Sequence, residues 1–386
     1  MNDFIFSYPT KVYFGQRSAQ KSLPGELNRT GKTVMLAYGG GSVNRNGIYD
    51  EICGILENAG KEIVEFSGIM PNPTYEKVQE GAALAKRTGV DFILAVGGGS
   101  VIDCCKIIAA QAMTKEDIWK MEFTDHVYPT EFLPMGAVVT ASGTGAEMNN
   151  GAVITNEELG IKTGVLGAHA RFAVLDPAYT MSLPMNQVVS GAFDTLSHCM
   201  ETYFGRPEEI NLSDEIGEAV MRSVIRNTRA VIKNPEDMNA RSELMWASAM
   251  GENGILKIGK ITDFQAHQIE HQLGAYTDCN HGCGLAVIHP VLYKHLCVDG
   301  VEQFARFAKN VWEVPEDGKT RRELAYAGIE ALADFIKEIG LPTTFGEMGI
   351  TDKHIFRAVA NTCNITAGCC RKLSREEIYE ILEECC

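Results

Sequence analysis

Short runs typical of strands alternate with amphipathic segments through the first half of the chain. Strand-like runs lie at residues 34–38, 62–66, 92–96, 135–140 and 172–175. Between them, apolar side chains three and four positions apart predict helices at residues 49–58, 75–88 and 101–112. Strands that alternate with helices indicate parallel βαβ units and a doubly wound sheet.

From about Pro184 onward the pattern changes to long helical segments with almost no strand signal. Helices are predicted at residues 187–204, 212–233, 239–251, 261–275, 284–295, 301–311, 321–339 and 375–385. Loop signals such as Gly340-Leu341-Pro342 separate them. We therefore expect two domains, which fits a length of 386 residues: an α/β domain over residues 1–184 and an all-helical domain over residues 185–386.

Two of the predicted strands end in glycine runs that lead into helices. The first run is Gly39, Gly40, Gly41 and Ser42, and the second is Gly97, Gly98, Gly99 and Ser100. Backbone amides at a helix N-terminus attract phosphate, and ligands of open α/β sheets bind beyond the carboxyl ends of strands. Neither run is G-x-G-x-x-G or a Walker A loop, and each alone could be a tight structural turn. The pair together predicts a nucleotide site.

A third segment, residues 140–147, follows another strand and is rich in hydroxyls and glycines, among them Thr140 and Thr144. It suits hydrogen bonds to a pyrophosphate or ribose, although a Ser/Gly surface loop would look the same.

The first glycine run bears on the choice between NAD and NADP. An acid commonly binds the ribose 2′-hydroxyl of NAD at such a position, but here no carboxylate is present and Arg45 follows. This pattern favours NADP over NAD.

Candidate metal ligands are concentrated in the helical half. Asp194 and His198 are four residues apart, and so are His267 and His271, so each pair shares one face of its predicted helix. His281 follows at a loop-to-helix junction. A lone helical histidine is more often structural, but three imidazoles and a carboxylate can hold a divalent cation. Fe²⁺ and Zn²⁺ both suit that set.

Cysteine chemistry offers an alternative centre. Cys279 and Cys283 flank His281 and could form a Cys/His zinc site, but no second cysteine-rich element lies nearby in the sequence. The sequence contains no H-E-x-x-H motif and no G-x-S-x-G elbow.

Composition narrows the classes of function and location. The net charge of -15 disfavours nucleic acid as a partner. No run of about 18 apolar residues predicts a membrane span. Twelve scattered cysteines, and a start that does not resemble a secretory signal, are typical of reduced thiols in the cytoplasm.

At this point the motifs resemble those of the iron-dependent, or group III, alcohol dehydrogenases, over essentially the whole chain. Within that family they are similar to the butanol dehydrogenase branch, which includes NADPH-dependent aldehyde reductases. The matching motifs are Gly97-Gly-Gly-Ser-Val-Ile-Asp103, Gly143-Thr-Gly-Ala-Glu-Met148, Gly191-Ala-Phe-Asp-Thr-Leu-Ser-His198, His267-Gln-Ile-Glu-His271 and His281-Gly282. Ala146 departs from the expected serine, which removes at most one hydroxyl contact.

The resemblance implies a role for each matching residue. The metal ligands of the family are matched by Asp194, His198, His267 and His281. An unligated histidine between the metal and the nicotinamide is matched by His271. The second glycine run matches the pyrophosphate loop. Positions near the adenine, ribose or nicotinamide are matched by Thr140, Thr144, Asn149, Lys162 and Tyr179. The implied fold is a Rossmann-like N-terminal domain with an all-α C-terminal domain, the dehydroquinate synthase-like architecture, in a homodimer.

The function that follows is a metal-dependent, NAD(P)H-linked alcohol dehydrogenase that reversibly reduces small to medium aldehydes such as butyraldehyde. The bound cation would act as a Lewis acid on the substrate oxygen. We expect His271 to relay a proton or to orient the substrate. A glycerol dehydrogenase-like enzyme of the same fold remains an alternative. So do a metal-dependent phosphoester hydrolase, which would not need two glycine-rich turns, and a non-enzymatic nucleotide sensor.

Overall fold

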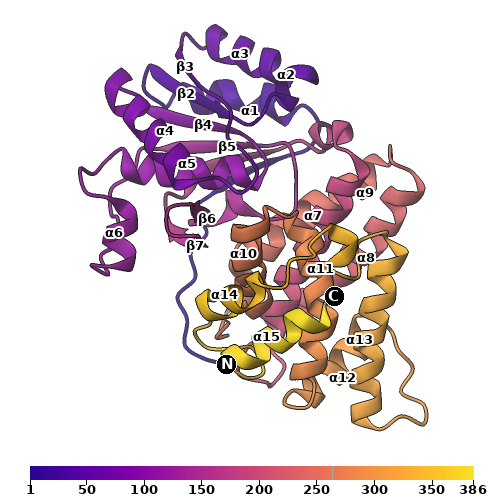
Figure 1. Cartoon of the computed structure of the whole chain (residues 1–386). Helices are drawn as coiled ribbons and strands as arrows, with labels where there is room; N and C mark the ends of the chain where they lie inside the picture. Colours follow the sequence, from indigo (N-terminus) through magenta and orange to yellow (C-terminus); the bar gives the residue numbers. More distant parts are fainter. Residues whose placement is uncertain (263) are drawn as a thin grey trace. The chain divides into compact units, whose positions relative to one another are not determined.

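The computed structural model describes residues 1–262 and 264–386, which divide into two compact units. One unit is Ser7–Leu183, and the other combines Met1–Phe6 with Pro184–Cys386. The first is built on a parallel sheet and the second is helical (Figure 1), which confirms the expected fold class. Met1–Phe6 groups with the helical unit, where the backbone N–H of Asn2 donates to the carbonyl oxygen of Gly259 at 3.1 Å. The division of cofactor and metal binding between the units stays a prediction.

The first unit contains a six-stranded sheet in the order β1-β8-β5-β4-β2-β3. Its strands are β1 (Lys11–Phe14), β2 (Thr33–Tyr38), β3 (Glu62–Phe66), β4 (Phe92–Gly97), β5 (Met135–Val139) and β8 (Ala170–Leu175). All five neighbouring pairs are parallel. Tyr38 is therefore in register with Val96, and Gly97 with Val139, so β2, β4 and β5 end at the same edge of the sheet.

Helices cover both faces of this sheet (Figure 1). The helices of this unit are α1 (Ser18–Leu27), α2 (Ser42–Arg45), α3 (Ile48–Asn58), α4 (Tyr75–Thr88), α5 (Gly99–Gln111) and α6 (Ile118–Phe123). Leu23 of α1 and Ile52 of α3 share one buried cluster with Leu36 of β2. On the opposite face α5 packs along β4 and against α4. The buried sheet therefore explains why its strands are almost continuously apolar.

A small antiparallel hairpin, β6 (Gly151–Asn156) and β7 (Ile161–Leu166), was not expected from the sequence. It is joined to α5 by Lys106, a side chain with no exposed surface. The Lys106 ammonium donates to Asn149 Oδ1 at 3.0 Å and to the carbonyl oxygen of Gly151 at 2.6 Å. It also lies 3.3 Å from Asp103 Oδ1. This buried charge cluster fixes the hairpin against the helix that follows the second glycine run.

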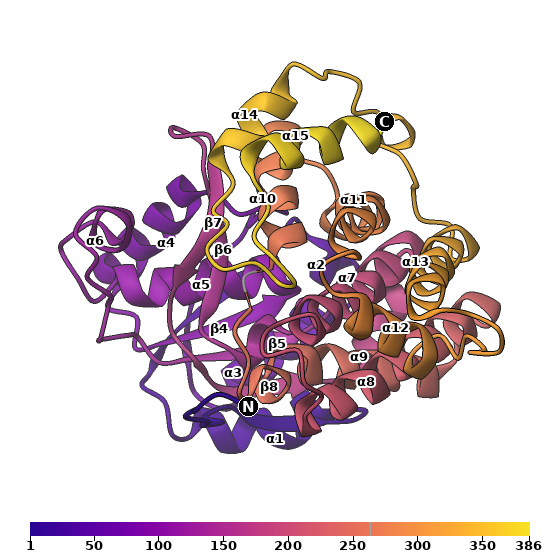
Figure 2. The same ribbon diagram turned by 90° about the horizontal axis from the view of Figure 1, so that it is seen from below.

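The helical unit is built from nine α-helices among the described residues. They are α7 (Met185–Tyr203), α8 (Leu212–Lys233), α9 (Met238–Glu252), α10 (Gln265–Thr277), α11 (His281–Leu296), α12 (Val301–Asn310), α13 (Arg321–Glu338), α14 (Ile355–Thr362) and α15 (Arg375–Glu384). The ring of Phe204 stacks on Phe304 with centroids 4.1 Å apart and meets Tyr293 edge-on at 5.0 Å, in the centre of the core. α14 packs against α15 and α10 (Figure 2).

Helix boundaries follow local capping where caps are present. α8, α13 and α15 each begin with a capping box, at Asn211, Thr320 and Ser374. α10 begins at Gln265, not at 261 as expected, after Phe264 in the left-handed conformation with φ 55°. Residue 263, within the expected helix, lies outside the described residues. Within the described part of the chain, no helix is both long and apolar enough to cross a membrane.

A buried carboxyl group in the first unit makes its stability depend on pH. Glu147 lies in the short 3₁₀ helix Ala146–Met148 and is 4% exposed. Burial raises its pKa from the usual 4.5 to about 7, and Asp103 adds to the increase while Lys106 opposes it. Between these two pH values the folded protein binds more protons than the unfolded chain. The free energy of unfolding therefore falls as the pH rises through this window.

We expect Glu147→Gln to remove that fall, because the amide does not ionise. At pH 8 the variant should be more stable than the wild type by about 3 kcal/mol. Urea-unfolding midpoints measured from about pH 5 to about pH 8 test this, with the exposed Glu157→Gln as the control. A wild-type stability that does not fall relative to Glu147→Gln over this range would contradict the assignment.

Candidate active site

Three helices bring the predicted metal ligands together. Asp194 and His198 lie one turn apart on α7, His267 lies in the first turn of α10, and His281 is the first residue of α11. Asp194 Oδ1 faces three ring nitrogens: it lies 3.4 Å from His198 Nε2, 3.5 Å from His267 Nε2 and 3.4 Å from His281 Nε2. Four ligand atoms thus converge from segments far apart in the sequence.

The spacing of these atoms fits a shared divalent cation. Ligand atoms about 2.1 Å from one ion at tetrahedral angles are about 3.4 Å apart, close to the observed separations. Asp194 Oδ1 and His267 Nε2 are buried, and neither makes a hydrogen bond among the described residues. Buried polar atoms without hydrogen bonds are costly unless another partner is present. The donor set of one carboxylate and three imidazoles suits iron or zinc.

His198 is less tightly placed than the other ligands. The ligand atoms of Asp194, His267 and His281 all lie within 4.8 Å of one another, and His198 stands outside that group. Its ring is nonetheless 4.3 Å from that of His267, centroid to centroid. The structure therefore brings all four predicted ligands to one place, while their role as ligands stays a prediction.

Each histidine ring in this set also meets a buried glutamate, which the sequence analysis missed. His198 Nδ1 lies 3.0 Å from Glu252 Oε1. The Nδ1 atoms of His267 and His281 are paired with Glu201 and Glu270. The spacing 194, 198, 201 on α7, and Glu270 three residues after His267, were the available sequence signals.

The charges of the site favour a cation. Burial alone would raise the pKa of Asp194, but the neighbouring His198 and His281 rings hold that pKa well below its usual range. Burial alone would lower the pKa of His267, but the adjacent carboxylates of Asp194 and Glu201 raise it to about 10. The site therefore attracts positive charge, which a divalent cation supplies.

His271, the predicted unligated histidine, lies one turn after His267 on α10 and is 6% exposed. Its ring is 5.5 Å from that of His281 and 6.0 Å from that of His267, centroid to centroid. It is not part of the group formed with Asp194. The structure thus places His271 beside the candidate metal centre, as its predicted role requires.

The predicted cofactor loops lie together at the carboxyl edge of the sheet. β2 runs into Gly39, β4 ends at Gly97, and Thr140 follows β5 directly. A Cβ atom on Gly99 would lie 2.4 Å from Thr144 Oγ1, so the second glycine run and the hydroxyl-rich segment are in close contact. These loops form one continuous edge, and the N-terminus of α5 opens onto it.

The other predicted cofactor residues occupy different surroundings. Asn149 is held by Lys106, and Lys162 is buried on β7 of the hairpin. Tyr179 belongs to the cluster on the α1–α3 face of the sheet, and its hydroxyl donates to Glu51 Oε1 at 2.8 Å. Asn149 is therefore hydrogen-bonded to Lys106 of α5, whereas Tyr179 is hydrogen-bonded to Glu51 of α3.

The first glycine run lies beside a guanidinium group. A Cβ on Gly41 would be 3.7 Å from a terminal nitrogen of Arg45, so the Arg45 side chain folds back over the loop. The nearby carboxylate of Glu65 accepts hydrogen bonds from the hydroxyls of Tyr38 at 2.9 Å and Tyr49 at 2.5 Å. Its two oxygens are thus already engaged by phenol groups.

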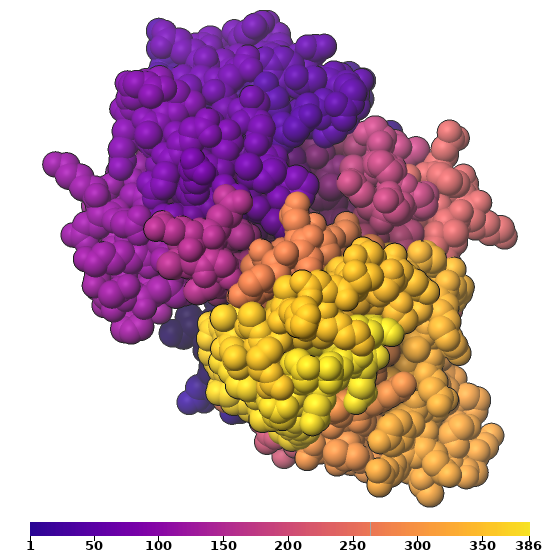
Figure 3. Space-filling view, viewed as in Figure 1, coloured from indigo at the N-terminus to yellow at the C-terminus, as the bar shows by residue number. Residues whose placement is uncertain are grey.

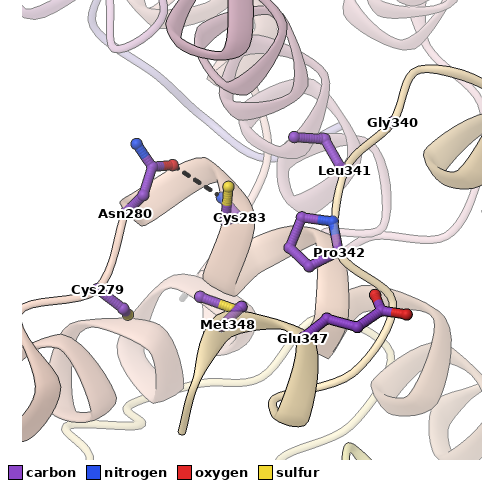
Figure 4. A pocket seen from close by; sticks show the side chains of 8 residues that line it. All are labelled: Cys279, Asn280, Cys283, Gly340, Leu341, Pro342, Glu347 and Met348. Carbon is purple, nitrogen blue, oxygen red and sulfur yellow. Dashed lines mark hydrogen bonds between the residues drawn. The ribbon is translucent and has the colours of Figure 1, made fainter.

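A pocket of about 440 Å³ opens in the helical unit at the start of α11 (Figure 4). Part of its wall comes from the C-terminal segments that form much of this unit's visible face in Figure 3. None of the predicted metal or cofactor residues is among the residues that line it, so we assign it no substrate. The lining residues are Cys279, Asn280, Cys283, Gly340, Leu341, Pro342, Glu347 and Met348.

Comparison with known proteins identifies the family. Residues 9–177 match the iron-containing alcohol dehydrogenase family, and residues 188–386 match its C-terminal region. The NADH-dependent butanol dehydrogenase A of Clostridium acetobutylicum is 37% identical over 391 residues, covering 100% of both chains. The NADPH-dependent aldehyde reductase YqhD of Escherichia coli is 34% identical, covering 92% of this chain and 91% of the reductase.

A solved structure agrees with these sequence matches. The crystal structure of an NADH-dependent butanol dehydrogenase A from Thermotoga maritima aligns with a TM-score of 0.93 and 34% identity, covering 100% of this chain and 99% of that one. The protein therefore belongs to the iron-containing alcohol dehydrogenase family. The butanol dehydrogenase and aldehyde reductase relatives confirm the branch expected from the motifs.

The contact between the second glycine run and the hydroxyl-rich segment gives a test of the cofactor site. Gly99→Ala should weaken NADPH binding at least about 10-fold, because the new methyl group displaces Thr144 or the first turn of α5. Gly54→Ala is the matched control, since a Cβ there meets no atom within 4 Å. Titration of NADPH fluorescence measures both, and wild-type affinity in Gly99→Ala would contradict a phosphate site at this turn.

Proposed function

We propose that the protein is a metal-dependent alcohol dehydrogenase that uses NAD(P)H to reduce small to medium aldehydes, such as butyraldehyde, reversibly to primary alcohols. The observation that carries this proposal is the convergence of Asp194 Oδ1 and three histidine Nε2 atoms at 3.4–3.5 Å. The relatives named for butanol dehydrogenase and aldehyde reductase activity support the substrate class.

The overall reaction transfers a hydride from C4 of the nicotinamide to the carbonyl carbon, while the carbonyl oxygen gains a proton. Aldehyde, NADPH and H⁺ thus give alcohol and NADP⁺. The metal would be held by Asp194, His198, His267 and His281, and when bound it would supply Lewis-acid polarisation of the substrate oxygen. The glycine turns after β2 and β4 bind the phosphates and so fix the position of the nicotinamide.

We assign to His271 the transfer of the proton that the carbonyl oxygen gains. Its ring stands beside those of His267 and His281, and it comes from the same helix as one proposed ligand. A histidine in that position can pass a proton to the oxygen of the product or orient the substrate before transfer.

We propose NADPH as the preferred cofactor. Arg45 lies over the first glycine run and can pair with a 2′-phosphate, while no carboxylate within that run repels one. The similar relatives include one named as NADH-dependent and one named as NADPH-dependent. The preference of this protein between NADPH and NADH therefore has to be measured directly.

We also propose a homodimer that works in the cytoplasm. The edge strand β1 and the exposed side chains of Phe4, Ile5 and Phe6 offer surface for a second copy. A molar mass of twice the 42.2 kDa chain mass, measured by light scattering, would support a homodimer. None of the twelve cysteines, all of which the structure describes, forms a disulfide, as in a reducing compartment.

The reaction is tested with protein stripped of metal and reloaded anaerobically with Fe²⁺ or Zn²⁺. We expect one metal to restore oxidation of NADPH by butyraldehyde, faster than oxidation of NADH. Asp194→Asn should lower kcat/KM at least about 100-fold, because a ligand carboxylate is lost, whereas the exposed Asp317→Ala should not. Glycerol with NAD⁺ and a phosphate monoester are the comparison substrates. Turnover of either in place of the aldehyde would overturn the proposal.

The role of His271 is tested separately. His271→Ala should lower kcat about 10- to 100-fold and change its pH profile, because the proton donor is lost, while metal content stays at the wild-type level. His295→Ala, a change far along α11, serves as the matched histidine control. An enzyme that keeps the wild-type kcat and pH profile without His271 would remove the relay.

A further inference from the structure

Three buried glutamates surround the candidate metal centre, one behind each histidine. Glu201 comes from α7, Glu252 from the last position of α9, and Glu270 from α10. Their exposed fractions are 1%, 7% and 0%. Each has a carboxylate oxygen at the Nδ1 atom of a different ring, so the Nε2 atoms of the three rings are all left on the side of Asp194.

A carboxylate at Nδ1 does two things to an imidazole. It accepts the Nδ1–H, which fixes the tautomer whose Nε2 lone pair is available to a metal, and it holds the plane of the ring. Its negative charge also makes Nε2 a stronger donor. Hydrogen bonds of this kind join His267 to Glu201 and His281 to Glu270, and Glu252 Oε1 lies 3.0 Å from His198 Nδ1 as an ion pair. The three carboxylates therefore orient the histidine set before any ion binds.

Glu201 also anchors the start of α10. Besides the His267 ring, its oxygens accept the backbone N–H of Ala266 at 2.6 Å and that of His267 at 3.1 Å. The same carboxylate thus anchors the first turn of α10 and orients the ligand carried by that turn. A helix N-terminus also favours a negative charge at this position.

Glu252 differs, because a cation accompanies it. Lys257 Nζ lies 2.9 Å from its second oxygen and 4.7 Å from the ring centroid of Phe264. Its charge is therefore partly balanced, and we expect it to strengthen its histidine less than a carboxylate without such a pair.

We propose that Glu201, Glu252 and Glu270 are positioning residues that set the metal affinity of the centre through the three histidines. The inference rests on the metal site of the proposed function and not on its substrate, because it takes the Asp194 centre to hold the ion. Glu270, His271 and His281 also form a second close group. The pairing of Glu270 with His281 Nδ1 accounts for that group, so no second ion is needed there.

The test uses glutamine substitutions in the full chain. Glu201→Gln, Glu252→Gln and Glu270→Gln keep a hydrogen-bond acceptor of the same shape but remove the charge. Zn²⁺ affinity of the metal-free protein, measured by competition with a chelator and without cofactor or aldehyde, should fall about 10- to 100-fold in Glu201→Gln and Glu270→Gln. The loss in Glu252→Gln should be smaller, because Lys257 already offsets that charge.

Glu218→Gln is the matched control. Glu218 is a buried glutamate of the same unit, 6% exposed, whose partners are the Tyr203 hydroxyl and the Asn310 amide. It should bind Zn²⁺ as the wild type does. The absorption spectrum of bound Co²⁺ is a second readout, and should change in the three variants but not in the control.

Wild-type Zn²⁺ affinity in all three variants would overturn the inference and leave the proposed function standing. Unfolding of all three metal-free variants, with Glu218→Gln folded, would also overturn it, in favour of a purely structural role. If the wild type binds Zn²⁺ as expected but turns over no aldehyde with any metal, the proposed function fails while the inference remains intact.

Discussion

The burial of the Asp194 carboxylate against three imidazoles is the constraint on which the rest of the site depends. Asp194 is 4% exposed, and its Oδ1 faces three ring nitrogens contributed by α7, α10 and α11. A buried carboxylate is costly unless positive charge compensates it. The packing of these helices around one apolar core fixes the distances, so a large part of the helical unit serves to hold a few polar atoms in place.

The proposed binding groups differ between the two units. In the α/β unit they are backbone amides of the glycine runs, and the close approach of Gly99 to Thr144 leaves no room for a side chain. In the helical unit they are side chains, and each histidine of the proposed metal set lies against a carboxylate. At the Gly99 turn, glycine leaves space for Thr144. At the histidines, a buried glutamate orients the ring and adds negative charge.

Much of the fold followed from the sequence because its periodic signals are strong. α8 at Leu212–Lys233 and β3 at Glu62–Phe66 were predicted to the residue. The β6–β7 hairpin was missed because its strands carry polar residues that are buried by packing on α4 and α5. The later start of α10 depends on a left-handed Phe264, a conformation that no periodicity reveals.

The candidate site was predictable to a similar degree. Spacing and resemblance pointed to Asp194 and the three histidines, whose convergence the structure supplies. Helical spacing was the only sequence signal for Glu201 and Glu270. Lys106 beneath Asn149 was not predictable, because such pairings join residues distant in sequence, as Lys106 and Gly151 show at 2.6 Å. A lone buried charge leaves no mark in a hydrophobic pattern until its partner is known.

The most direct test of the Asp194 metal centre is the position of the metal in a crystal of the reloaded protein, located by anomalous scattering at the absorption edge of that metal. We expect a single peak bonded to an Asp194 oxygen and to Nε2 of His198, His267 and His281, at about 2.0–2.2 Å. A peak at the thiols of Cys279 and Cys283, with none at Asp194, would contradict it.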